Sequence, residues 1–124
     1  MLKLTLALGV AYYLIGAVVH WFGLTLFPFF DARLYTSYQD SVIAVAALVI
    51  AMFLFVIARD PVKNIDTLKI VILAAFLGSI FSIAIVWKVD FDSIGAPDKK
   101  LQTIVEGIMG FAFAGSLLYF YPRK

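Results

Sequence analysis

The sequence of 124 residues contains no cysteine, a single histidine and few charged residues. Without cysteine the chain cannot form disulfides, thiolate metal sites or thiol nucleophiles. Charged residues make up 15% of the chain and hydrophobic residues 64%, whereas soluble domains have about 25% charged and roughly 45–50% apolar residues. The net charge of +2 is too small to indicate a nucleic-acid partner. This composition predicts an integral membrane protein.

Four long stretches lack aspartate, glutamate, lysine and arginine, apart from Glu106 in the last of them. A helix needs roughly 17–25 apolar residues to cross the hydrocarbon core of a bilayer, and each stretch meets this length. The alternation of apolar and polar residues that is typical of β-barrel strands is missing. We therefore predict one all-α domain over residues 1–124, an integral membrane four-helix bundle with helices at about 4–27, 40–58, 67–88 and 100–121.

Lysines and arginines indicate how this bundle is oriented. Four crossings place both termini and the second connector on one side, which carries six of these residues against four on the other. The positive-inside rule then predicts cytoplasmic N- and C-termini, in the cytoplasmic membrane if the chain is bacterial or archaeal. The side of the termini has Lys3, Arg59, Lys63, Lys69, Arg123 and Lys124, and the other side has Arg33, Lys88, Lys99 and Lys100.

The polar residues that interrupt the apolar stretches form the candidate site. His20, Ser82 and Glu106 are expected at similar depth in one half of the bilayer, and Asp40 lies at the mouth of the same region. A charged glutamate at this depth is costly, so we expect it to be protonated, paired or facing water in a cavity. We predict that these four residues converge.

Two interpretations of this cluster differ in what His20 and Glu106 do. In the first, they form a hydrogen bond between the first and fourth helices and only fix the packing. In the second, they line a pocket for the polar head of a lipid, a quinone or another apolar ligand, or a path for protons. A metal site of His20, Glu106 and Asp40 is the weakest alternative, because it has one nitrogen ligand and no sulfur. We predict no metal and no cofactor.

Two local patterns predict how the helices begin and pack. Ser37 and Asp40 have the spacing of a capping box, which predicts that Asp40 caps the second helix. Small residues fall on one face of each helix, where they allow neighbouring helices to approach closely. These residues are Gly9, Gly16 and Gly23 on the first helix, Ala44, Ala47 and Ala51 on the second, Ala75, Gly78, Ser79 and Ser82 on the third, and Gly107, Gly110 and Ala114 on the fourth.

The order of several features along the chain resembles a known group of proteins. The first helix has Gly16 and His20, the second ends in Ala58-Arg59-Asp60-Pro61, a polar turn and a third helix follow, and the fourth helix contains Glu106-Gly107. This order resembles that of the small four-helix DoxX-like membrane proteins and spans most of the chain. The resemblance implies a four-helix fold, and some members of that group are small subunits associated with membrane oxidoreductases.

The sequence favours a role without catalysis. The connectors are too short to build a site outside the bilayer, and the apolar stretches offer one histidine and one acid. We therefore expect an accessory or structural subunit of a larger membrane complex, or a homo-oligomer, with lipids, other membrane subunits or further copies of the chain as partners. The alternative is a small transporter or a protein that binds a lipid or quinone in a polar pocket around His20 and Glu106.

Overall fold

The computed structural model describes residues 1–32 and 36–122. Within them the chain forms four helices and a short antiparallel pair of strands, and each helix is long and apolar enough to cross a membrane. The helices are α1 (Leu2–Phe22), α2 (Ser37–Arg59), α3 (Ile65–Lys88) and α4 (Pro97–Tyr119), and the strands are β1 (Thr25–Leu26) and β2 (Phe30–Asp31). The predicted four-helix all-α class is confirmed.

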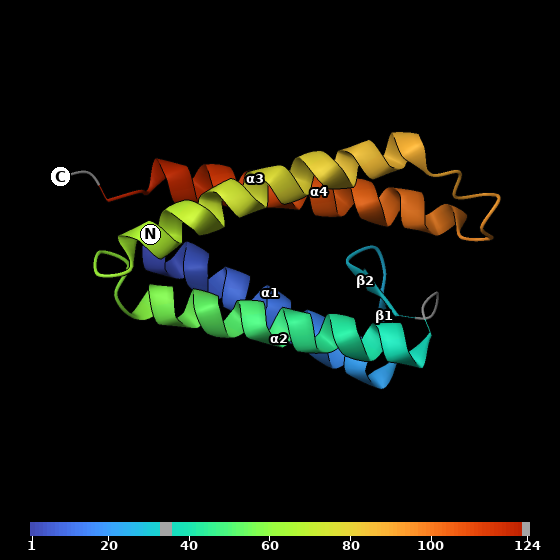
Figure 1. The fold of residues 1–124 in the computed structure, drawn as a ribbon, viewed down its shortest axis with the longest axis horizontal. Helices are drawn as coiled ribbons and strands as arrows, with labels where there is room; N and C mark the ends of the chain where they lie inside the picture. Colours follow the sequence, from blue (N-terminus) through green and yellow to red (C-terminus); the bar gives the residue numbers. More distant parts are fainter. Residues whose placement is uncertain (33–35, 123–124) are drawn as a thin grey trace.

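The helices pair in chain order and form two layers (Figure 1). α1 packs along α2 and α3 packs along α4, and the layers meet mainly through α1 and α4. Figure 1 shows the layers close together at the end that carries the N-terminus and the α2–α3 turn, and separated at the other end, where the β1–β2 hairpin lies between them. An apolar core from all four helices joins the layers at the close end; its residues are Leu6, Leu54, Ile57, Leu68, Ile72 and Leu117.

The end of α1 differs from the prediction because of one glycine. Gly23 adopts a left-handed conformation with φ 63° and ψ 37°. Its N–H donates to the His20 carbonyl at 3.4 Å, and the Leu24 N–H donates to the Val19 carbonyl at 2.8 Å. This pattern closes a helix, so the predicted continuation to residue 27 was wrong. The apolar residues beyond Gly23 form the hairpin instead, with Thr25 opposite Asp31 and Leu26 opposite Phe30.

Glycines on α1 and α4 allow close contacts between elements. A Cβ added at Gly16 would lie 2.8 Å from the ring of Phe30, so the hairpin can pack on α1 only because this side chain is missing. A Cβ added at Gly110 would collide with the hydroxyl of Ser79 on α3. The predicted small-residue face of α3 is correct at Ser79, whereas Gly78 is exposed with no atom within 4 Å of an added Cβ.

The start of α2 also differs from the prediction. Thr36, rather than Ser37, is the residue before the helix, and its hydroxyl accepts a hydrogen bond from the Gln39 N–H at 3.2 Å. Gln39 Oε1 in turn accepts from the Thr36 N–H at 3.2 Å, which completes a capping box. The box therefore lies one residue earlier than predicted. Asp40 has no part in it and is buried at 5% exposure, where its side chain faces α1.

Candidate functional site

Buried polar side chains gather at the hairpin end of the bundle, opposite the apolar core. Of the buried polar residues that the structure describes, Ser79 lies between α3 and α4, and the others lie where α1 ends, in β2 of the hairpin, and where α2 and α4 begin. Those others, together with the half-buried Glu106, are called the polar cluster below. The polar cluster consists of His20, Asp31, Asp40, Lys99, Gln102 and Glu106.

His20 and Asp40 form a buried pair between α1 and α2. His20 Nδ1 lies 2.8 Å from Asp40 Oδ1, and the two side chains are 9% and 8% exposed. An ionised carboxylate can only accept, so the ring N–H at Nδ1 donates to it. A hydrogen bond of this kind fixes the orientation and the tautomer of the imidazole. Glu106 forms its hydrogen bond with Gln102, so the hydrogen bond between His20 and Glu106 of the first interpretation is not formed.

Lys99 connects α4 to the hairpin and starts a chain of hydrogen bonds along α4. Its Nζ donates to the backbone carbonyl of Asp31 at 2.7 Å and to Gln102 Oε1 at 2.8 Å. Gln102 Nε2 then donates to Glu106 Oε1 at 2.9 Å. Spacings of three and four residues place these side chains on one face of the helix. Lys99 was expected just before the fourth helix, among the cations of the other side, whereas it lies in the first turn of α4 with only 8% exposure.

Electrostatic interactions join the two parts of the polar cluster. The Lys99 ammonium interacts with the carboxylates of Asp31, Glu106 and Asp40. Asp31 also accepts a hydrogen bond from the Thr25 hydroxyl at 2.7 Å across the hairpin. A buried charge is tolerated only where opposite charges and hydrogen bonds compensate it. The residues of the polar cluster therefore form one compensated network rather than separate pairs.

Of the polar-cluster residues on α4, Glu106 lies furthest from the start of the helix. It lies nine residues after Pro97, which corresponds to about 13 Å along α4 at 1.5 Å per residue. Its carboxylate interacts electrostatically with the phenol groups of Tyr12 and Tyr13 on α1. Tyr12 packs against Tyr13 with ring centroids 5.4 Å apart and against Phe30 at 4.8 Å. The charge of Glu106 thus reaches an aromatic group on the opposite layer.

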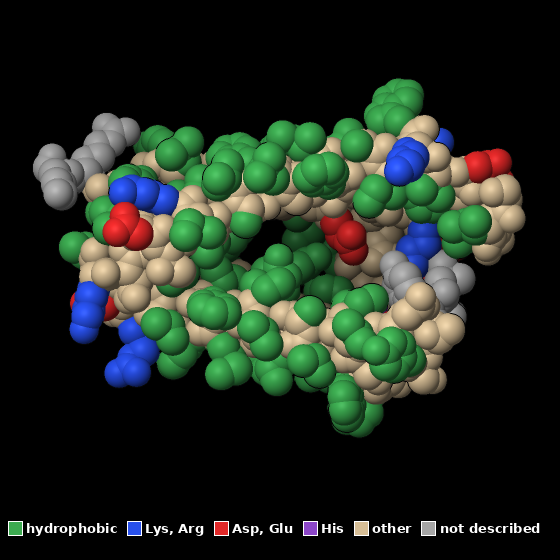
Figure 2. Space-filling view, in the orientation of Figure 1, with side chains coloured by type: hydrophobic (Ala, Val, Ile, Leu, Met, Phe, Trp, Pro, Cys, Tyr) green, Lys and Arg blue, Asp and Glu red, His purple; other side chains and the backbone are tan. Residues whose placement is uncertain are grey.

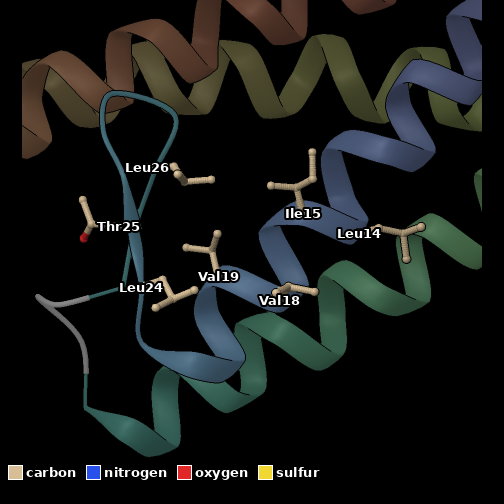
Figure 3. Close-up of a pocket in the computed structure, with 7 residues that line it drawn as sticks. All are labelled: Leu14, Ile15, Val18, Val19, Leu24, Thr25 and Leu26. Carbon is tan, nitrogen blue, oxygen red and sulfur yellow. The ribbon is translucent and has the colours of Figure 1, made fainter.

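The space between the layers is open beside this region. Figure 2 shows hydrophobic side chains along the sides of both layers, lysines and arginines toward the two ends, and a hollow between the layers with an acidic side chain beside it. An apolar groove of about 450 Å³ also lies between α1 and the start of the hairpin (Figure 3). Ligand pockets range from about 300 to 1,000 Å³, so its size suits an apolar group. Its lining residues are Leu14, Ile15, Val18, Val19, Leu24, Thr25 and Leu26.

The structure brings together three of the four predicted site residues. His20, Asp40 and Glu106 belong to the polar cluster, whereas Ser82 is half-buried on α3 and takes part in none of the hydrogen bonds among residues 1–32 and 36–122. Within these same ranges, no group of three histidine or acidic side chains could hold a metal ion. Arg33, Arg123 and Lys124, which entered the orientation count, lie outside the described residues.

The hydrogen bonds of Lys99 predict a measurable role in holding the hairpin. Lys99→Met keeps most of the side-chain volume and removes the donor. Because hydrogen bonds to charged groups contribute about 1.5–3 kcal/mol, we expect the free energy of unfolding to fall by about that amount. Hydrogen–deuterium exchange should become faster at the backbone amides of residues 24–32. Lys100→Met changes the neighbouring exposed lysine and should alter neither quantity; equal effects of the two substitutions would contradict the role of Lys99.

Comparisons of the chain with protein-family models, with curated proteins and with solved structures give no match.

Proposed function

We propose that the chain is a multi-pass integral membrane protein that binds a lipophilic ligand with a polar head group between its two helical layers. One observation carries the proposal: the polar cluster does not end at the hairpin but continues along α4 to Glu106, which is only half-buried. Ionisable residues at membrane depth face a partner, a cavity or a ligand path. A network that only fixed packing would have no need of an accessible carboxylate at this depth.

The four apolar helices support insertion in the membrane, and the described cations support the orientation. Lys3, Arg59, Lys63 and Lys69 lie at the end of the termini and the α2–α3 turn. At the hairpin end Lys99 points inward, which leaves Lys88 and Lys100 at the surface among the described residues. The exposed positive charge of the described residues, four cations against two, therefore also favours cytoplasmic termini. The ligand site then lies in the outer half of the membrane.

Mass spectrometry of the purified protein tests the binding function. The protein is extracted in a mild detergent, and the organic extract is compared between the wild type, Glu106→Gln and Asp66→Asn. We expect a lipophilic compound at a stoichiometric amount in the wild type and in Asp66→Asn, and its loss from Glu106→Gln. Asp66 is the matched control because it is an exposed acid at the start of α3. The same content of bound compound in all three proteins would refute the proposal.

A second candidate is the role of an accessory subunit, which the exposure of α3 favours. In its most apolar window α3 is only 11% buried, against 22–28% for the other helices. A neighbouring helix from another subunit, or from a second copy, would cover this surface. Native mass spectrometry after gentle extraction distinguishes the candidates: unrelated subunits at fixed stoichiometry support the accessory role, and a monomer that carries a lipophilic compound supports ligand binding.

A further inference from the structure

Another apolar groove lies between α3 and the end of α4, at the end of the bundle that carries the termini. Its volume is about 420 Å³, and its lining residues are Lys69, Ile72, Leu73, Phe76, Leu118 and Tyr121. This volume falls within the range of about 300–1,000 Å³ that ligand pockets have. The polar cluster lies at the opposite end of the bundle. The groove is therefore a separate surface that the proposed ligand site does not use.

The groove is polar at one end and apolar along the rest. Lys69 lies four residues after the start of α3 and Tyr121 lies two residues beyond α4, at the same end of the bundle (Figure 1). Phe76 lies seven residues further along α3 than Lys69, which corresponds to about 10 Å at 1.5 Å per residue. This length fits within one leaflet of a hydrocarbon core about 30 Å thick. An occupant would therefore have its polar part beside Lys69 and its apolar part toward Phe76.

The charges at this end of the bundle favour an anion as the polar part. Cations near a membrane surface attract anionic lipids. Among the described residues, this end has four cations, Lys3, Arg59, Lys63 and Lys69, and two acids, Asp60 and Asp66. Of these residues, Lys69 lines the groove. The positive charge is thus placed at the polar end of an otherwise apolar surface.

The ammonium group of Lys69 is available to such an anion. Its Nζ donates a hydrogen bond to Asp66 Oδ1 at 2.9 Å, but the two side chains are 60% and 87% exposed. An exposed pair of this kind contributes little, since solvent screens it and its formation costs side-chain entropy. A lysine ammonium has three donors, so it can bind a phosphate oxygen beside the carboxylate or in place of it. Tyr121 adds a ring of the type that is enriched at the level of lipid headgroups.

We propose that this groove binds an anionic phospholipid, with the phosphate beside Lys69 and an acyl chain along Leu73 and Phe76. A free anion would leave the apolar walls uncovered, whereas a phospholipid uses both parts of the groove. In the orientation proposed above, this end faces the cytoplasm, and the cytoplasmic leaflet carries anionic lipids. The inference goes beyond the ligand binding proposed at the polar cluster and shares with it only the insertion of the helices in a membrane.

Native mass spectrometry of the full chain in non-ionic detergent micelles tests the preference for an anionic lipid. The probes are phosphatidylglycerol and phosphatidylcholine with identical acyl chains, which differ in headgroup charge. We expect the wild type to bind phosphatidylglycerol at least fivefold more tightly. Equal affinity for the two lipids, or a preference for phosphatidylcholine, would overturn the proposal. Glycerol 3-phosphate has the phosphate without acyl chains; if it displaced the lipid at equal concentration, the site would bind anions without the groove and the proposal would also be wrong.

Substitutions at the polar end of the groove test the role of Lys69. Lys69→Gln should lower the affinity for phosphatidylglycerol at least fivefold, and Asp66→Asn should raise it because the competing carboxylate is removed. Lys63→Gln is the matched control, since Lys63 is an exposed lysine of the α2–α3 turn outside the groove, and it should leave the affinity within twofold. Equal effects of the two lysine substitutions, or weaker binding by Asp66→Asn, would contradict the proposal.

Substitutions along the groove test its apolar part. Leu73→Trp places a larger side chain in the groove and should weaken the binding of both lipids at least fivefold. Leu8→Trp changes a leucine of α1 that is similarly exposed, at 63% against 59%, and should have no effect. Unchanged binding by Leu73→Trp would refute the groove as the site. A dimer in the spectra that Leu73→Trp dissociates would show that a second copy covers the groove, and would overturn the proposal.

This inference and the proposed function can fail separately. A preference for phosphatidylglycerol that Lys69→Gln abolishes, in a protein that carries no compound dependent on Glu106, would refute the proposed function alone. Equal affinity for the two lipids, in a protein that carries a compound lost with Glu106→Gln, would refute only the phospholipid site.

Discussion

Asp40→Ala should lower the free energy of unfolding by roughly 1.5–3 kcal/mol, which is the contribution of a hydrogen bond to a charged group. Asp40 is 5% exposed, and its Oδ1 lies 2.8 Å from His20 Nδ1. The substitution leaves the imidazole without this partner at the junction of α1, α2 and the hairpin. Unfolding by sodium dodecyl sulfate in mixed micelles, followed by circular dichroism, measures the change.

An exposed ion pair provides the control for this experiment. Lys69 Nζ and Asp66 Oδ1 lie 2.9 Å apart, but the side chains are 60% and 87% exposed. Solvent screens such a pair and its contribution is small, so Asp66→Ala should leave stability almost unchanged. The double substitution of His20 and Asp40 by leucine should restore part of the loss, because apolar residues can replace a buried pair. Equal losses in Asp40→Ala and Asp66→Ala would show that burial has no influence here.

Gly110→Leu should separate α3 from α4 and lower the free energy of unfolding by about 3 kcal/mol or prevent folding, since overpacking of a tight interface has costs of this size. Even a Cβ at Gly110 would collide with the Ser79 hydroxyl, and it would lie 3.7 Å from the Ala75 carbonyl oxygen. Backbone atoms cannot move aside without shifting the helix. The same unfolding measurement, with the yield of folded protein, reports the effect.

Gly115 is the matched control on the same helix. A Cβ there has no neighbour within 4 Å, so a leucine at Gly115 gains helix propensity without a collision. We expect Gly115→Leu to be as stable as the wild type or more so. If both leucine variants lost stability equally, the close approach of α3 and α4 at Gly110 would not explain the result.

The helices were predictable because their determinants are local. Uninterrupted apolar stretches of membrane length define each helix, and Pro61 stops α2 at Arg59, one residue from the predicted end. The end of α1 was missed because counting charges does not detect a glycine that closes a helix. Gly23 was interpreted as part of a packing face, whereas its positive φ ends the helix.

The candidate site was predictable only in part, because partners depend on tertiary geometry. Helical spacing and depth placed His20, Asp40 and Glu106 in one region; in the structure His20 is hydrogen-bonded to Asp40, and Glu106 is hydrogen-bonded to Gln102. The pairing was wrong because the position of the hairpin, and hence of Lys99, cannot be inferred from periodicity. The spacing of Lys99, Gln102 and Glu106 along one helix face was the available signal, and it was missed because Lys99 was counted with the exposed connector.

The similarity to DoxX-like proteins, the accessory role and the cytoplasmic position of the termini stay predictions. The described geometry neither requires nor opposes them, because a four-helix arrangement is compatible with several functions. The experiments above test the role and the ligand directly.

The apolar core joins the two layers at the end of the termini, and the hairpin joins them at the other end. A hinge motion of the two layers would turn about the core residues around Leu6 and Leu117. Glu106 and Tyr12 lie further from this hinge. A small rotation about this hinge would change the separation of the two layers in proportion to the distance from the hinge. The separation would therefore change most at the hairpin end. In the function proposed above, a ligand would enter between the layers at this end, where the hydrogen bond from Lys99 to the Asp31 carbonyl holds α4 to the hairpin.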